Sequence, residues 1–61
     1  MPMVRIELVP GRTREQKARA AREITEAMTR TLGAKPEATQ IVFIEVERAD
    51  WAAAGKLLDE G

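Results

Sequence analysis

The residue best placed to do chemistry is Pro2, which directly follows Met1. Removal of Met1 before a small residue would leave the Pro2 nitrogen as a free secondary amine at the start of a strand. Burial disfavours the charged form of an amine, so a sheltered position would lower the pKa of this nitrogen. Such an amine can take a proton beside a carbonyl group and return it to another atom. The pattern therefore predicts a general acid/base at Pro2.

Other catalytic groups are scarce in the 61 residues. The chain has no histidine, cysteine or tyrosine, which excludes cysteine or histidine catalysis, disulfide bonds and the common zinc sites. Ten basic and ten acidic residues give no net charge, which argues against a nucleic-acid partner. No apolar stretch approaches the ~20 residues that cross a bilayer, and there is no secretory signal. We therefore expect a cytoplasmic protein without a membrane or nucleic-acid partner.

The elements that must position this proline follow from the spacing of apolar residues. Residues 3–9 alternate between apolar and polar side chains, which is typical of a half-buried strand. Thr13 and Gln16 have the spacing of a capping box at the start of a helix. Apolar residues then recur every three or four positions as far as Leu32, and Gly33 can end the helix in a left-handed conformation.

A second strand is predicted at residues 39–46. Its centre, residues 41–44, is apolar at every position, as in a strand that is covered on both faces. Residues 48–51 indicate a turn or a single helical turn. The tail at residues 52–58 fits either a short hairpin or an arm that packs against another surface.

Strand, helix and strand in this order predict an α+β fold, with one β-α-β unit and parallel strands in a single domain over residues 1–61. One helix can cover only one face of the sheet, and a core of this size rarely supplies more than ~3–5 kcal/mol. Two copies paired edge to edge would form a four-stranded sheet with two helices on one face. Because the other face would still be bare, we expect a larger oligomer.

One combination of residues covers nearly the whole chain. Its members are Pro2, Gly11, Arg12, Glu15, Gln16, Lys17, Arg22, Glu23, Ile24, Glu26, Ala27, Leu32, Ile41, Val42, Glu45, Val46 and Trp51. No single motif in it is specific, but together and without gaps they resemble 4-oxalocrotonate tautomerase and its small relatives. The resemblance weakens after Trp51.

The resemblance implies a tautomerase, an isomerase acting on a small enol or oxo-acid that carries a carboxylate. It implies that Pro2 is the catalytic acid/base and that Arg12 binds a substrate carboxylate and draws electrons through the conjugated system. Trp51 matches the position of an aromatic that walls the pocket. No metal or organic cofactor is implied. The implied assembly is a hexamer, built as a trimer of dimers, in which neighbouring subunits share each site.

Gln40 departs from the family pattern. The best-known members have a second arginine at this position, contributed from another subunit to the substrate. A glutamine donates only neutral hydrogen bonds and cannot form a charged bidentate pair. It would bind substrate more weakly, and a monocarboxylate becomes the more plausible substrate. Arg5 or Arg48 could partly substitute for the missing charge.

Two alternatives remain open at the level of the sequence. The same site could add water across a conjugated acid, as a hydratase or dehalogenase, with Glu7 or Glu45 as an additional carboxylate. Alternatively, the chain could be a non-catalytic subunit of a mixed hexamer whose partner supplies the missing arginine. Gln40 favours this second alternative, because it removes a charged group that the family uses.

Overall fold

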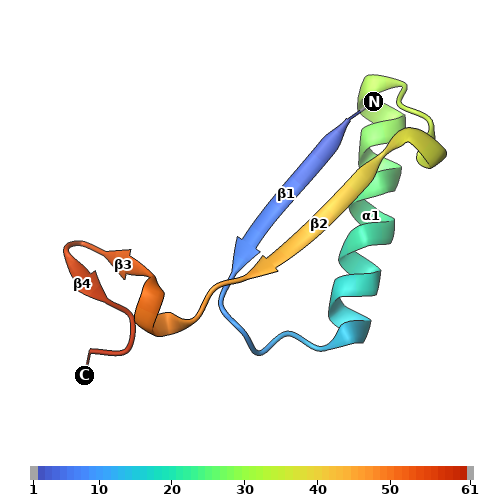
Figure 1. Ribbon diagram of the computed structural model, residues 1–61. Coiled ribbons are helices and arrows are strands. Elements are labelled where there is room, and N and C mark those ends of the chain that lie inside the picture. The colour runs from blue at the N-terminus through green and yellow to red at the C-terminus, as the bar shows by residue number, and fades with distance from the viewer. Residues whose placement is uncertain (1, 61) are drawn as a thin grey trace.

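The computed structural model describes residues 2–60, so the predicted removal of Met1 lies outside the described residues. Strand β1 (Met3–Leu8), helix α1 (Arg14–Leu32) and strand β2 (Gln40–Glu45) form the predicted β-α-β unit, with a short 3₁₀ helix η1 (Pro36–Ala38) before β2. Figure 1 shows α1 running alongside the two strands. The predicted α+β fold is confirmed.

Strands β1 and β2 pair in parallel, from Met3 opposite Gln40 to Leu8 opposite Glu45. Side chains of paired residues share a face, and successive residues alternate between faces. Ile6 and Phe43 therefore lie together on the face that α1 covers. The opposite face carries Val42 among its side chains and has no helix over it.

The helix ends where the sequence predicts. Thr13 Oγ1 accepts from the Gln16 amide at 3.1 Å, and Gln16 Oε1 accepts from the Thr13 amide at 2.8 Å. Gly33 has φ 69° and donates its amide to the Thr29 carbonyl at 3.0 Å. Both ends of α1 are thus fixed locally, by groups that satisfy otherwise unpaired main-chain atoms.

The carboxyl-terminal tail is a short hairpin, one of the two forms that the sequence allowed. After the 3₁₀ helix η2 (Arg48–Asp50), strands β3 (Ala52–Ala53) and β4 (Lys56–Leu57) pair antiparallel. Figure 1 shows this hairpin extending away from the β-α-β unit. It is built largely on local contacts.

Among residues 2–60, no side chain is fully buried. The accessible surface is 4906 Å², against about 4,000 Å² for a compact monomer of this mass. The Cα radius of gyration is 14.6 Å, against about 10.5 Å for a compact domain of this length. A single copy therefore lacks a fully buried core, whereas the sequence predicts a small core and one bare face of the sheet.

The surplus exposed surface includes large apolar side chains on the face that α1 leaves bare. Met3 is 57% exposed and Val42 is 39% exposed, and the half-buried Ile44 lies on the same face as Val42. Leu57 in the hairpin is 41% exposed. Exposed apolar side chains of this kind mark a surface for contact with other molecules, and we expect further copies of the chain to cover it.

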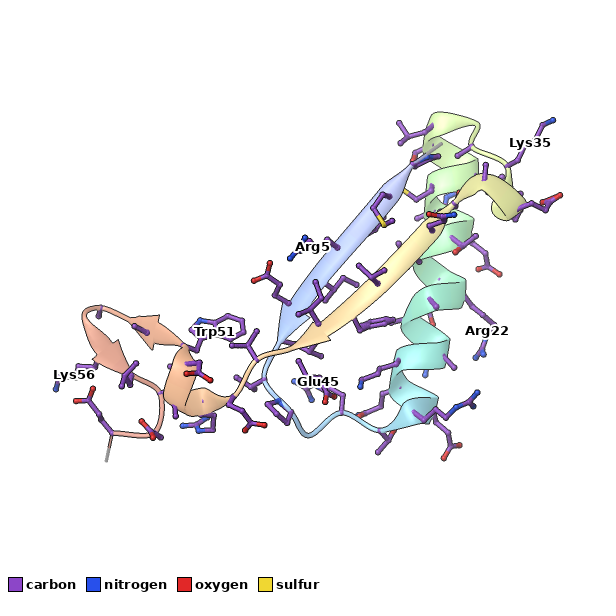
Figure 2. The ribbon with its side chains drawn as sticks, viewed as in Figure 1. Arg5, Arg22, Lys35, Glu45, Trp51 and Lys56 are labelled. Atoms are coloured by element: carbon purple, nitrogen blue, oxygen red, sulfur yellow. The ribbon has the colours of Figure 1, made fainter. Side chains whose placement is uncertain are left out.

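Replacing Val42 with glutamate should break the assembly. A charge on a covered apolar face costs about 2 kcal/mol or more, which corresponds to about 30-fold weaker association. Sedimentation velocity should show smaller species for Val42→Glu at concentrations where the wild type stays assembled. Arg22→Glu, on the outer face of α1 (Figure 2), is the matched control and should sediment like the wild type. A wild type that is monomeric and folded at every concentration would contradict this expectation.

Candidate active site

Pro2 and Gln40 lie at the amino-terminal end of the two strands. The Gln40 amide donates to the Pro2 carbonyl at 3.0 Å, and Pro2 is half-buried. Gln40 pairs with Met3 and so lies on the bare face of the sheet. Within one chain, the link between Pro2 and Gln40 thus runs through main-chain atoms.

Arg12 lies at the other end of the sheet. It belongs to the loop that follows β1, and a strand of this length places it about 20 Å or more from Pro2. Figure 1 shows this loop leaving β1 at the end opposite to the start of the strand, which Pro2 directly precedes. One copy of the chain therefore does not bring the two predicted catalytic residues together.

Trp51 follows the carboxyl-terminal end of β2, beyond η2. It is half-buried, and its carbonyl accepts from the Leu58 amide at 2.9 Å. Figure 2 shows Trp51 between the hairpin and the ends of the strands. Arg12 and Trp51 thus both follow the same end of the sheet, the end opposite Pro2 and Gln40.

A hollow of about 200 Å³ lies between the sheet and the first turns of α1. Its apolar lining comes from Ile6 and Leu8 of β1, Phe43 of β2 and Ala20 of α1. Three polar residues, Arg12, Gln16 and Lys17, complete the lining. The hollow therefore combines an apolar surface with two cationic side chains and one amide.

The two cations of this hollow differ in their partners. Lys17 Nζ lies 2.5 Å from Glu45 Oε2, an ion pair that joins α1 to β2. Arg12 is exposed and forms no ion pair within the described part of the chain. Arg12 is thus the cation that an incoming carboxylate can meet without displacing an internal partner.

The other arginines that could replace the missing charge at Gln40 have partners. Arg5 Nε lies 3.3 Å from Glu7 Oε2 on the bare face of the sheet. The Arg48 guanidinium donates to the Leu58 carbonyl and holds the hairpin. Neither arrangement supports the idea that these arginines substitute for a second substrate-binding arginine.

The same contacts bear on the carboxylates proposed for water activation. Glu7 is paired with Arg5, and Glu45 is paired with Lys17. To activate water, a carboxylate needs an oxygen that is free to accept a proton, and here each carboxylate already contacts a cation. The arrangement therefore does not favour the hydratase or dehalogenase alternative.

One ion pair with displaced pKa values lies outside the hollow. A hydrogen bond from Arg19 Nε at 2.6 Å, together with the attraction of its charge, lowers the pKa of the Glu23 carboxyl. The same hydrogen bond raises the pKa of Arg19. Because the two residues lie one turn apart on the exposed face of α1, we attribute the pair to helix stabilisation.

Neither metal-binding clusters nor membrane-spanning helices occur in the described residues. No group of three or more acidic side chains within residues 2–60 could hold a metal ion. Over the same range, no helix is both long and apolar enough to cross a bilayer.

Sequence reasoning missed the hollow and the ion pair between Lys17 and Glu45. A signal for the pair was present. Lys17 interrupts the apolar stripe of α1 three residues before Ala20, and Glu45 follows Phe43 on the covered face of β2. Opposite charges on the facing sides of two adjacent elements indicate an ion pair between them, and here that pair is partly exposed.

Comparison with known proteins shows which protein family has this sequence and fold. The chain matches the family described as "Tautomerase enzyme" over residues 2–61. It is 44% identical over 61 residues to the 2-hydroxymuconate tautomerase of Bacillus subtilis, and the match covers 98% of this chain and 97% of that protein. The crystal structure of a 4-oxalocrotonate tautomerase homologue superposes with a TM-score of 0.91 at 35% identity, over 100% of this chain and 98% of that one.

A third similar protein is the heterohexameric 4-oxalocrotonate tautomerase of Chloroflexus aurantiacus, with a TM-score of 0.91 and 28% identity over 98% of this chain and 97% of that one. The fold and these matches define a small β-α-β isomerase subunit. The chain belongs to the tautomerase family, in its 4-oxalocrotonate tautomerase group. The resemblance drawn from the sequence is confirmed, and so are the predicted tautomerase and isomerase classes.

Replacing Arg12 should weaken the handling of any carboxylate substrate. Loss of a charge-assisted hydrogen bond costs about 1.5–3 kcal/mol, so Arg12→Ala should lower kcat/KM by about 10- to 100-fold. Steady-state kinetics with an enol acid measures this effect. Arg14→Ala removes an exposed arginine two residues away that does not line the hollow, and it should leave kcat/KM within about twofold. Equal losses in both variants would refute a specific role for Arg12.

Proposed function

We propose that the Pro2 nitrogen, freed by removal of Met1, moves a proton between carbon and oxygen of a small enol or oxo-acid bearing a carboxylate. The observation that carries this proposal is the position of Pro2 at one end of β1, with Arg12 and an apolar hollow at the other. If two copies paired antiparallel through their β1 strands, Pro2 of one copy would lie near Arg12 and the hollow of the other copy. Each tautomerase site would then belong to two subunits.

The direction of pairing decides whether a site forms. The sheet has the order β1-β2, so each strand has one free edge. Two-fold pairing of identical edges is antiparallel, and β1 against β1 would place Pro2 about one strand spacing, ~4.8 Å, from the partner's strand near Leu8. Pairing through β2 would separate the two β1 strands by about 14 Å. The geometry therefore favours the β1 edge.

The proton transfer needs a neutral amine. In its uncharged form, the Pro2 nitrogen takes a proton from the enol oxygen or from a carbon beside the carbonyl. It then carries this proton as an ammonium and returns it to the other end of the conjugated system, so no proton is lost overall. Arg12 would hold the substrate carboxylate and stabilise the charge that develops. Trp51 would shield the amine from water, which lowers the pKa of the amine.

We further propose a hexamer built as a trimer of dimers. The bare sheet face with Met3, Val42 and Ile44 would be covered by neighbouring dimers, which accounts for the missing core. The same contact would bring residues of the bare face, Gln40 included, toward the sites of other subunits. Gln40 would then give one neutral hydrogen bond to the substrate.

A second candidate is a subunit of a mixed hexamer. It is favoured by Gln40, which stands where the best-known relatives have an arginine, and by the heterohexameric assembly of the Chloroflexus aurantiacus relative. A different partner chain would supply that arginine. Activity that appears only after mixing with a second small subunit would favour this candidate over a homohexamer.

Replacing Pro2 tests the proposed acid/base. Pro2→Ala should lower kcat for the ketonisation of phenylenolpyruvate by about 10²–10⁴-fold, because general acid/base catalysis contributes that much. Pro10→Ala, at the other end of β1, is the control and should retain activity. In the wild type the rate should fall as the pH drops below the pKa of the amine, because the protonated nitrogen cannot act as a base.

The chemical state of Pro2 can be measured directly by intact mass. The proposal expects a mass that lacks Met1. Fully active protein that retains Met1, whose bond to Pro2 would be an amide without basicity, would overturn it.

A further inference from the structure

We propose that Thr13 is a positioning residue for Arg12. Its reciprocal hydrogen bonds with Gln16 fix the backbone from which the Arg12 side chain extends, and so hold the Arg12 guanidinium at the hollow before a substrate binds. Thr13 does not line the hollow itself, so it acts only through its neighbour. This inference rests on the proposed function, because it takes Arg12 as the residue that binds the substrate carboxylate.

The Arg12 side chain has no charged partner to hold it. It is exposed and forms no ion pair within residues 2–60, although it lines the hollow. Ordering a long arginine side chain costs conformational entropy. Figure 1 shows the loop of residues 9–13, to which Arg12 belongs, crossing from the end of β1 to the start of α1. The place of the guanidinium therefore depends on what fixes this loop.

Thr13, directly after Arg12, is bonded to the first turn of α1 through its amide, its hydroxyl and its carbonyl. The amide donates to Gln16 Oε1 at 2.8 Å, and Oγ1 accepts from the Gln16 amide at 3.1 Å. The Thr13 carbonyl accepts from the Lys17 amide at 3.1 Å. These bonds hold Thr13 at φ −77° and ψ 163°. They restrict the directions in which the Arg12 side chain can leave the loop.

Gly11, directly before Arg12, also has a demanding backbone conformation. Its φ of 132° lies in a region that glycine adopts readily and other residues rarely. Apart from its chain neighbours, no atom lies within 4 Å of the place that a Cβ would take, so the backbone and not crowding favours glycine. The loop is thus specified on both sides of Arg12. The need to place its side chain accounts for this.

The same hydrogen bonds tie the loop to the wall of the hollow. Gln16 and Lys17, which bond Thr13, both line the hollow together with Arg12. A donor that is already in place binds its ligand with a smaller ordering cost. Misplacement of a substrate-binding group by a small distance can slow a reaction by a large factor. Loss of the Thr13 contacts should therefore weaken the action of Arg12.

Thr13→Gly removes these contacts with little loss of helix stability. Glycine is tolerated at the start of a helix, but it has no hydroxyl to accept from Gln16 and makes the loop more flexible. Thr13→Ser keeps the hydroxyl and should restore the wild-type behaviour. Thr31→Val is the matched control, because it removes an exposed hydroxyl that bonds the Ala27 carbonyl at 2.6 Å, on α1 but outside the hollow.

The kinetic experiment measures kcat/KM for phenylenolpyruvate. Thr13→Gly should lower it by about fivefold or more, because Arg12 is no longer held in place. Thr13→Ser and Thr31→Val should stay within about twofold of the wild type. In the Arg12→Ala background, Thr13→Gly should have no further effect beyond about twofold, since the residue that it positions is absent. A merely structural role of Thr13 would lower kcat/KM by the same factor in both backgrounds.

Binding without turnover separates this inference from the proposed function. NMR titration of the assembled protein with hydrocinnamate, an unreactive carboxylate, gives dissociation constants for the wild type, both single variants and the double variant. We expect Thr13→Gly to weaken binding by about fivefold or more only where Arg12 is present. Absence of turnover with phenylenolpyruvate would refute the proposed function, while these constants would still decide the inference.

Three outcomes of the titration would overturn the role of Thr13. The first is weakening by Thr13→Gly of equal size in both backgrounds, and the second is no weakening when Arg12 is present. The third is hydrocinnamate binding that Arg12→Ala leaves unchanged, because Arg12 would then hold no carboxylate and Thr13 would have nothing to position.

Discussion

The apolar character of both faces of β2 constrains the rest of this molecule. Ile41 and Phe43 lie under α1, while Val42 and Ile44 lie on the bare face. One helix of 19 residues cannot cover both sides of a sheet. Because no described side chain is fully buried within one copy, burial of this surface has to come from association. Folding and assembly are therefore expected to be coupled.

The parallel β-α-β topology has a second consequence, because it separates the predicted catalytic groups. Parallel strands place their amino-terminal ends together, which joins Pro2 to Gln40, and their carboxyl-terminal ends together, which gathers Arg12 and Trp51. The unit cannot fold back to bring these ends into contact. A two-fold axis across the β1 edge would do so without any change in the chain. The two needs thus call for different contacts: pairing at the β1 edge would complete the site, and packing of sheet faces would cover the apolar surface.

Local sequence signals predicted most of the fold. The capping box of Thr13 and Gln16, the left-handed Gly33 and the alternation along β1 are short-range features, and the structure has all three. The strands proved shorter than predicted, ending at Leu8 and spanning Gln40–Glu45, because the parallel pairing defines their ends. The pair of Lys17 and Glu45, 28 residues apart, and the hollow beside Ala20 were not foreseen. They depend on how closely α1 approaches the sheet and on the volumes of the side chains between them. Spacing along the chain does not specify these quantities.

The position of Arg12 is also unusual in energetic terms. It lies just before α1, where the positive end of the helix dipole disfavours a cation by about 0.3–1 kcal/mol. Lys17, in the first turns of the same helix, has Glu45 as a partner, whereas Arg12 has none among residues 2–60. The chain has as many acidic as basic residues, yet none of the described acidic side chains forms an ion pair with Arg12. A bound carboxylate would offset the repulsion from the helix and pair the guanidinium at once. The local electrostatics therefore favour an anionic ligand at Arg12 although the chain as a whole carries no net charge.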